Sequence, residues 1–314
     1  MGRFLRTGLL FLAVSLVVYL SAMLVLCRVE WGGYPLVFRT GDHYHLKGGL
    51  AYTKFREWDP GAQYDVLVVG SSHAYRGYDP RLFAAEGLSM FNLGSSAQTP
   101  LNTRAVLRQY ARPGHVGLVL FDVFEGAVSN DGLESTSELV MNIGSGTAAM
   151  EMALVQRDLR GLNQLVVRWM LADRAPDVVD STYVSGGFSE RTDSLDHAVE
   201  YRPFNRSLVR SEQLAYMADC LALCRERGIP VVVVTHPQPH QADSLGHLAF
   251  RTIIDSLCAP QGVPYLDMAL GHALDDRAHF YDHNHLNLAG VRRFNADLVG
   301  RLRAAGLIRP AVGP

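Results

Sequence analysis

The sequence has little of what a nucleic-acid-binding, disulfide-rich or repetitive protein needs. Its 29 basic and 31 acidic residues give a formal net charge of -2 without long runs of either sign, so no basic surface for nucleic acid is predicted. The four cysteines, Cys27, Cys220, Cys224 and Cys258, form neither a metal knuckle nor a dense disulfide framework. No repeat of about twenty to fifty residues is visible. The 48% of hydrophobic residues suffice for one large core.

The segment between Arg6 and Arg28 is uncharged and strongly apolar. As a helix it would be about 30 Å long, which is enough to cross a bilayer. It lacks the short apolar region and small-residue site of a cleaved signal peptide, and Leu26 before Cys27 does not suit a lipoprotein site. Residues 1–28 are therefore predicted to be an uncleaved anchor, with a buried N-terminal helix of a soluble protein as the alternative. Basic residues flank both ends, so an extracytoplasmic domain, periplasmic or at the cell surface, is expected only as the simpler arrangement.

A juxtamembrane linker at 29–62 is predicted to lead into a domain at 63–308 in which strand and helix patterns alternate. Apolar, β-branched runs predict strands at 65–70, 89–94, 115–122, 231–235 and 263–267. Proline and glycine boundaries and apolar patterns predict helices near 80–86, 100–110, 211–227, 242–257 and 288–304. The alternation breaks at about 126–206, which is interpreted as an insertion with one helix over 147–172. This order predicts a three-layer α/β/α fold with a mostly parallel five-stranded sheet.

Polar residues gather where the predicted strands end. Gly70-Ser71-Ser72-His73 follows the first strand, Gly94 ends the second, Asp122 closes the third and His236 follows the fourth. In an open parallel sheet, ligands bind outside the carboxyl ends of the strands. The turn after the first strand therefore presents two adjacent hydroxyls at the expected binding edge.

Asp282 and His285 lie three residues apart just before the last predicted helix. A serine is a poor nucleophile at neutral pH, so acyl transfer needs a base and a group that holds this base in its useful tautomer. One turn can bring the carboxylate to one imidazole nitrogen while the other nitrogen faces a serine. A capping aspartate beside a surface histidine is the alternative, but together with the Gly-Ser-Ser turn the spacing favours chemistry.

Three motifs resemble the SGNH (GDSL-like) hydrolase superfamily: Val69-Gly70-Ser71-Ser72, Asn92-Leu93-Gly94 and Asp282-x-x-His285. The resemblance implies a flavodoxin-like α/β/α fold, with Ser72 as nucleophile, His285 as base and Asp282 as its partner. It also implies that Gly94 and the Ser72 N–H point donors at a developing oxyanion. It covers neither the anchor nor the insertion.

Two departures from the family pattern matter. Ser71 replaces the usual aspartate before the nucleophile, and the expected Gly-x-Asn-Asp after the third strand is absent. Asn130, in a nearby Asn-Asp pair, is the remaining candidate for the oxyanion asparagine. Without that asparagine the site would resemble the family's envelope acyltransferases, which modify polysaccharides or teichoic acids, more than its free lipases and esterases.

Four further histidines follow the same strand ends or lie inside the Asp-x-x-His motif. His73 is a candidate pocket residue, or simply the start of a helix. His236 and His240 follow the fourth strand, and a substrate contact is the hypothesis for His236. His283 is the alternative base. His236, Asp282, His283 and His285 together also permit a metal-dependent hydrolase, although neighbouring Asp282 and His283 are awkward for one ion; no metal or other cofactor is predicted.

The sequence thus predicts a membrane-anchored serine esterase or O-acyltransferase acting on an acylated glycan or lipid of the cell envelope. Proteins of envelope biosynthesis are candidate partners. A catalytically inactive relative that binds or assembles envelope polysaccharide is the alternative from another class, because the Gly-x-Asn-Asp motif is missing.

Overall fold

The structure is a computed structural model of the 314-residue chain, and it describes residues 1–40, 49–171, 180–196, 206–240 and 244–308. Five parallel strands form the central sheet in the order β4-β3-β5-β8-β9. They are β3 (Tyr64–Val69), β4 (Met90–Asn92), β5 (Val116–Asp122), β8 (Val231–Thr235) and β9 (Tyr265–Asp267). Numbered along the chain, this is the 2-1-3-4-5 order of flavodoxin-like sheets, whose switch point lies between the first and third strands. The predicted three-layer α/β/α class is confirmed.

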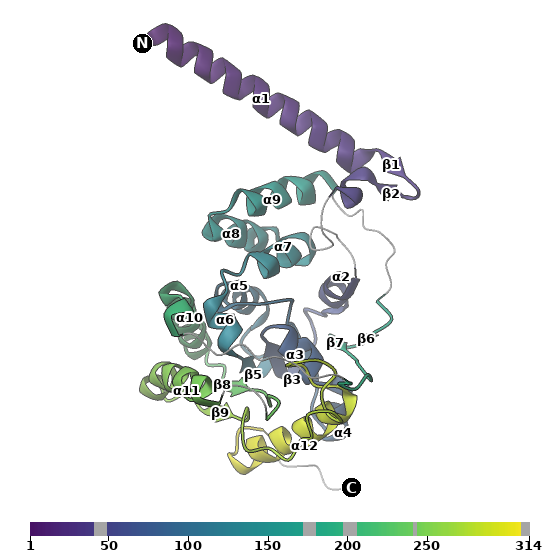
Figure 1. Cartoon of the computed structure of the whole chain (residues 1–314), viewed down its shortest axis with the longest axis vertical. Helices are drawn as coiled ribbons and strands as arrows, with labels where there is room; N and C mark the ends of the chain where they lie inside the picture. The colour runs from purple at the N-terminus through teal and green to yellow at the C-terminus, as the bar shows by residue number, and fades with distance from the viewer. Residues whose placement is uncertain (41–48, 172–179, 197–205, 241–243, 309–314) are drawn as a thin grey trace.

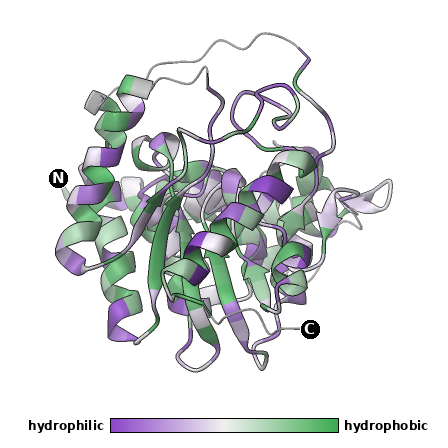
Figure 2. Ribbon diagram, turned by 90° about the horizontal axis from the view of Figure 1, so that it is seen from below, coloured by the Kyte–Doolittle hydropathy of each residue, from purple (hydrophilic) through white to green (hydrophobic). Residues whose placement is uncertain are grey.

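Alternate side chains of the strands pack on opposite faces of the sheet. One face, with Leu67, Val119 and Val233, is covered by α5 (Pro100–Tyr110), α10 (Ser211–Glu226) and α11 (Ser244–Cys258). The other face, with Val68, Leu120 and Val234, is covered by α3 (Ser72–Gly77), α4 (Pro80–Ala85) and α12 (Leu288–Ala304). Figure 2 shows the hydrophobic colour concentrated along the central strands. Burial on both faces explains why these strands read as continuous apolar runs.

Local sequence sets where several helices begin. Asp79 caps α4 by accepting the N–H of Arg81, and Pro80 fills the first helical position. Asn287 caps α12 by accepting the N–H of Gly290 at 3.0 Å. A capping side chain satisfies a donor that the helix itself leaves unpaired. The boundaries expected for α5, α10 and α12 agree with the structure to within one residue.

The region at 126–206 differs from the expectation of a single helix over 147–172. Its described part holds four helices, two of which replace that single helix: α6 (Glu125–Ser129), α7 (Leu133–Asn142), α8 (Gly146–Gln156) and α9 (Leu159–Leu171). Arg157 ends α8 in the left-handed conformation (φ 54°), and Asp158 then accepts the N–H of Arg160. The prediction missed this break because arginine carries no turn signal. A short antiparallel pair, β6 (Tyr183–Val184) and β7 (Phe188–Ser189), follows.

The segment interpreted as a linker contains ordered structure. After α1 (Gly2–Arg28) come the two-residue strands β1 (Glu30–Trp31) and β2 (Tyr34–Pro35), a short 3-10 helix (Leu36–Arg39) and α2 (Gly49–Glu57). Ala51 and Phe55 of α2 belong to the main hydrophobic core. Helix α2 is thus part of the domain.

Helix α1 projects away from the domain (Figure 1). Among the described residues it is the one helix long and apolar enough to cross a membrane, and its most apolar window is not buried by the rest of the protein. By length and composition, then, α1 matches the predicted anchor.

Candidate active site

The switch point of the sheet places Ser72 at the start of α3, directly after β3. Gly70 makes this turn with φ 147°, and a Cβ there would lie 2.6 Å from the carbonyl oxygen of Asp122. Only glycine allows such a backbone conformation and such a close approach. The glycine of the Gly-Ser-Ser motif therefore serves to bring the end of β3 against the end of β5.

The two serines of the turn have different surroundings. Ser71 is buried, and its Oγ caps α3 by accepting the N–H of His73 at 3.3 Å and lies 3.1 Å from Nδ1 of the same residue. Ser72 is partly exposed, and its Oγ lies 2.8 Å from Nε2 of His285. The geometry distinguishes a structural Ser71 from a Ser72 placed beside a base.

His285 comes from the loop that precedes α12. Its Nδ1 lies 2.8 Å from Oδ2 of Asp282, and Oδ1 of Asp282 also accepts the backbone N–H groups of Asn284 and His285. Asp282 can hold the proton of His285 on Nδ1, which leaves Nε2 free to accept from Ser72. The structure brings together the three residues that the sequence nominates as a triad, whereas His283 is exposed.

Burial and hydrogen bonds shift the pKa values of His285 and Asp282. Burial lowers the pKa of His285 below its usual value, against the opposite effect of Asp282. Partial burial favours a higher pKa for Asp282, but hydrogen bonds from His285 and from two backbone N–H groups lower it to about 2. Near neutral pH the pair is therefore a carboxylate beside a neutral imidazole, which is the state a general base requires.

Two further imidazoles, those of His73 and His236, stack behind His285 of the triad. The ring of His73 lies 4.5 Å from that of His285 and 3.9 Å from that of His236, with interplanar angles of 22° and 15°. Tyr281 stacks on His285 with its ring centre 5.6 Å away. Burial, followed by the neighbouring histidines, lowers the pKa of His73 well below its usual value. A neutral His73 fixes the ring of His285 without adding a second charge beside it.

His236 is buried and reaches the triad only through His73. Its Nδ1 lies 3.3 Å from both carboxylate oxygens of Asp122, whose Oδ2 also accepts from the hydroxyl of Tyr78 at 2.7 Å. His236 is thus held between Asp122 and His73, and the substrate contact predicted for it stays a prediction. His240, which follows the same strand, is instead paired with Asp276 at 2.9 Å.

His73, Asp122 and His236 are also a group with metal-ligand atoms, since these lie within 4.8 Å of one another. Metal-binding imidazoles point their in-plane lone pairs at one ion. The rings of His73 and His236 are nearly parallel and face each other, so their lone pairs do not converge. One of the two rings would have to turn before both could bind the same ion.

The motif Asn92-Leu93-Gly94 packs against the turn that carries Ser72 and the helix that follows it. The side-chain amide of Asn92 donates to the carbonyls of Ala74 in α3 and of Tyr78 directly after it, and its Oδ1 accepts the N–H of Gly94 at 3.0 Å. The N–H of Gly94 is thus already bonded, contrary to its predicted role as a free oxyanion donor. The structure instead requires Gly94 for space, because a Cβ there would lie 2.8 Å from the Cβ of Ala74.

Replacing Gly94 by alanine is expected to lower the free energy of unfolding by about 1–3 kcal/mol, the usual cost of overpacking. Besides the contact with Ala74, the new Cβ would lie 3.0 Å from backbone atoms of Ser71 and Tyr75. Urea unfolding measures the change. Gly300→Ala is the control, since nothing lies within 4 Å of that Cβ in α12. Equal stabilities of Gly94→Ala and wild type would contradict the close packing described here.

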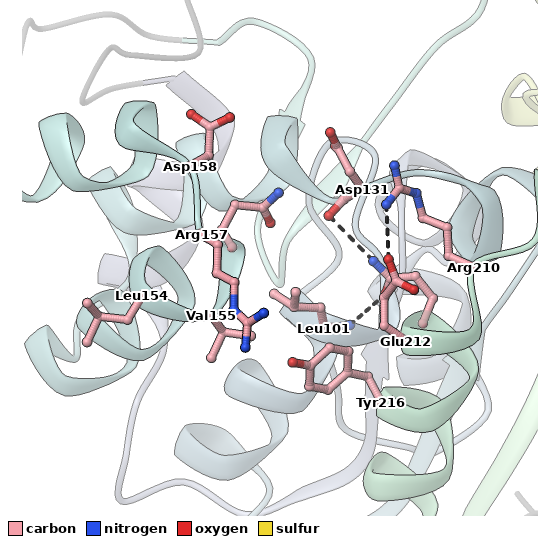
Figure 3. A pocket seen from close by; sticks show the side chains of 11 residues that line it. Leu101, Asp131, Leu154, Val155, Arg157, Asp158, Arg210, Glu212 and Tyr216 are labelled. Carbon is pink, nitrogen blue, oxygen red and sulfur yellow. Dashed lines mark hydrogen bonds and ion pairs between the residues drawn. The ribbon is translucent and has the colours of Figure 1, made fainter.

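Asn130 does not join the triad. Its Oδ1 accepts the N–H of Gly132 at 2.9 Å, and its carbonyl accepts from the side chain of Gln213 at 3.2 Å. These contacts place it beside α10, at a cavity of about 780 Å³ to which the next residue, Asp131, contributes. Figure 3 shows this cavity between the turn after α8 and the start of α10. None of the described residues that line it belongs to the triad, and the structure gives no support for Asn130 as the oxyanion asparagine.

Lys54 is a neighbour of the site that the sequence did not reveal. It extends from α2 and is buried, with Nζ 2.5 Å from the carbonyl oxygen of Gly94 and 4.9 Å from the ring centre of Tyr75. Burial lowers its pKa to about 7. No local pattern predicts this contact, because a lysine in a short polar helix is ordinarily solvated.

A cluster of charged side chains joins α6, α11 and the end of β9. His247 of α11 is buried, with Nδ1 2.7 Å from Oε1 of Glu125 and Nε2 3.0 Å from Oδ1 of Asp267. Although burial opposes a charge there, the two carboxylates raise the pKa of His247 to about 9. The three residues come from distant parts of the chain, so their meeting could not be read from sequence spacing.

The stability contributed by His247 is expected to depend on pH. Its folded-state pKa of about 9 exceeds the ordinary value of 6.5, so the contribution is complete below pH 6.5 and disappears as the pH rises through 9. A shift of this size corresponds to roughly 3 kcal/mol. Urea unfolding of wild type and His247→Gln at several pH values measures it. A stability difference that does not shrink between pH 6.5 and 9 would contradict a charged His247.

Comparison with known proteins gives structural likeness at low identity. No family model matches the chain, and no curated protein matches it. A candidate platelet activating factor from Streptococcus pneumonia is similar with a TM-score of 0.44 and 10% identity, over 80% of this chain and 91% of that chain. A candidate lipolytic protein of the G-D-S-L family from Desulfitobacterium hafniense DCB-2 gives 0.38 and 12%, over 76% and 98%.

Axe2, an acetylxylan esterase from Geobacillus stearothermophilus, is similar with a TM-score of 0.40 and 12% identity, over 80% of this chain and 99% of that chain. One of these neighbours is thus described as a lipolytic protein of the G-D-S-L family and another as an acetylxylan esterase. At such identities, what this chain does has to be argued from its own site.

Proposed function

We propose that this chain is a membrane-anchored serine esterase or O-acyltransferase that acts on an acyl ester of a cell-envelope glycan or lipid. The observation that carries the proposal is the continuous set of contacts from Ser72 Oγ through His285 to Asp282, with 2.8 Å at each step. Both distances lie within hydrogen-bond reach, as a nucleophile, its base and an orienting carboxylate require. The apolar helix α1 supports anchoring, and an extracytoplasmic domain is part of the proposal.

The reaction proceeds in two acyl transfers. Ser72 Oγ attacks the ester carbonyl while its proton passes to Nε2 of His285, and the resulting imidazolium is stabilised by Asp282. The tetrahedral intermediate then expels the alcohol, which takes that proton, and the acyl group stays on Ser72. Water or a sugar hydroxyl next gives its proton to Nε2 of His285 while its oxygen attacks the carbonyl of the acyl-serine. The second tetrahedral intermediate breaks its bond to Ser72 Oγ, which takes the proton back from His285, and the free acid or the new ester leaves. An esterase uses water in this last step, and an O-acyltransferase uses the sugar.

One oxyanion donor is available at the turn. The Ser72 N–H opens α3 and makes no hydrogen bond within the described part of the chain. Such a donor, aimed at the developing negative charge, contributes about 10²- to 10³-fold in rate. The Gly94 N–H can add a second one only if Asn92 releases it.

The surroundings of Gly94 and Asn130 support a second candidate function. Because the Gly94 N–H is already bonded and Asn130 contacts α10, the chain has fewer oxyanion donors than the family pattern implies. This favours, as the alternative, an inactive component that binds or assembles envelope polysaccharide.

Hydrolysis of an activated acetate ester tests the proposal. The full chain in detergent micelles is expected to release 4-nitrophenol in a burst followed by a slower steady state, as acyl-enzymes do. A soluble oligosaccharide that speeds the steady state and becomes acetylated indicates transfer, and an unchanged rate indicates hydrolysis. A folded chain that releases no 4-nitrophenol above the level of its Ser72→Ala variant would overturn the proposal and leave the binding role.

A further inference from the structure

Helix α9 has an apolar face that the domain does not cover. Its buried face, with Gly161, Gln164 and Leu171, belongs to the side that packs on α7 and α8. On the other side, Leu159 and Trp169 are 82% and 77% exposed, and Leu162 is also exposed. The spacings of three and seven residues put these three side chains on one face of the helix.

Helix α1 meets α9 at the border of this face, because Leu20 and Met23 belong to a cluster with Val166 and the buried Val167 and Met170. The hydroxyl of Tyr19 donates to Oδ1 of Asn163 at 2.5 Å. Asn163 and Val166 follow Leu159 by four and seven residues, so they share its face. The exposed apolar residues of α9 are therefore turned to the side from which α1 leaves the domain, as Figure 1 shows for the two helices.

The length of α1 indicates the depth in the membrane at which α1 contacts α9. Helix α1 has 27 residues and is about 40 Å long, against about 30 Å for the hydrocarbon core of a bilayer. Tyr19 lies nine residues before the end of α1 at Arg28, a rise of about 13 Å. Even with the whole excess of about 10 Å on the domain side, Tyr19 lies about 3 Å inside the hydrocarbon core, so α1 and α9 first meet at the edge between the core and the polar layer.

Two exposed tryptophans lie at the domain end of the contact between α1 and α9. Trp31 lies in the hairpin that directly follows α1, and its side chain is 70% exposed. Trp169 lies near the C-terminal end of α9 and is 77% exposed. Tryptophan is enriched where a membrane meets water, because its ring is apolar and its N–H needs a polar partner. Arg157 and Arg160 flank Leu159 at the start of α9, and basic residues beside an apolar stripe are typical of helices that lie in this layer.

We propose that α9 lies in the lipid–water interface, with Leu159, Leu162 and Trp169 facing the acyl chains. The proposal rests on the membrane anchoring by α1 that belongs to the proposed function. It makes α9 a second membrane contact that fixes the orientation of the domain. From α9 the contacts continue through α7, where Ser135 Oγ lies 2.8 Å from Ser95 Oγ just after Gly94. The active site is thereby held at a set height above the bilayer, which suits an acylated substrate carried at the membrane surface.

Fluorescence quenching in vesicles tests this placement. The chain has three tryptophans, so the double variant Trp31→Phe, Trp58→Phe leaves Trp169 alone. The full-length double variant is reconstituted into phosphatidylcholine vesicles whose acyl chains carry bromine near the headgroup or near the tail end. We expect strong loss of Trp169 emission with the shallow bromines, weaker loss with the deep ones, and little quenching by aqueous iodide. The triple variant, with Trp169→Phe added, gives the background signal.

Two controls keep the outcomes distinct. Resistance of the protein to extraction at alkaline pH reports whether α1 is inserted, and release of the protein would contradict the anchoring itself. If the protein stays in the membrane but iodide quenches Trp169 and bromine does not, the interfacial placement is overturned while the anchor stands. Emission shielded from both quenchers would mean that protein, such as a second copy of the chain, covers α9, and this also overturns the proposal.

Discussion

Replacing Ser72 by alanine is expected to lower kcat for ester hydrolysis by about 10⁴- to 10⁶-fold, the range found when a catalytic serine is removed. The hydroxyl of Ser72 contacts Nε2 of His285, and no other side chain at the turn offers an oxygen to that nitrogen. The fold should persist, because Ser72 is partly exposed and caps nothing. Steady-state rates with an activated ester, together with urea unfolding, measure both quantities.

Ser71→Ala is the matched control for this prediction. Ser71 Oγ caps α3 and contacts His73 rather than His285, so its loss is expected to cost about 1 kcal/mol of stability and to leave most of the activity. The opposite result, an active Ser72→Ala protein and an inactive but folded Ser71→Ala protein, would move the nucleophile to Ser71 and contradict the assignment.

Replacing Asp282 by asparagine is expected to lower kcat by about 10⁴-fold, as a wrong imidazole tautomer does in serine proteases. The carboxylate of Asp282 accepts from Nδ1 of His285, whereas an amide can donate to that nitrogen. The proton of His285 would then sit on Nε2, which could no longer accept from Ser72. The asparagine keeps a side-chain oxygen for the N–H groups of residues 284 and 285, so the loop should be retained.

The chain offers a matched control for Asp282 as well. Asp276 lies 2.9 Å from Nδ1 of His240, a second aspartate–histidine pair outside the triad. Asp276→Asn makes the same chemical change there, and the activity is expected to stay at the wild-type level. If Asp282→Asn keeps full activity at neutral pH, Asp282 does not set the tautomer of His285.

Features that depend on neighbouring residues were predictable from the sequence. The strands β3, β5 and β8 are buried on both faces and read as uninterrupted apolar runs. Asp282 and His285 meet within one turn, so their spacing carried the information. The contact of His285 with Ser72 spans 213 positions, and it was predictable only because parallel strands end at one edge of the sheet.

Features that depend on distant or backbone contacts were not predictable. The N–H of Gly94 is taken by a side chain two residues away, whereas the motif suggested a free donor. His236 pairs with Asp122, which ends the neighbouring strand, and its ring packs on that of His73. Lys54 reaches Gly94 from a segment that reads as a linker. In each case the competing partner, and not the local pattern, decides what the residue does.

Labelling of the full-length chain with a fluorophosphonate tests the central claim most directly, because the reagent forms a stable adduct only with a serine activated by a neighbouring base. Intact mass and peptide mapping locate the adduct. The account predicts one adduct, on Ser72, which Ser72→Ala abolishes, Asp282→Asn slows strongly and Ser71→Ala leaves in place. A well-folded protein that forms no adduct, or forms it on a serine other than Ser72, would contradict a triad of Ser72, His285 and Asp282.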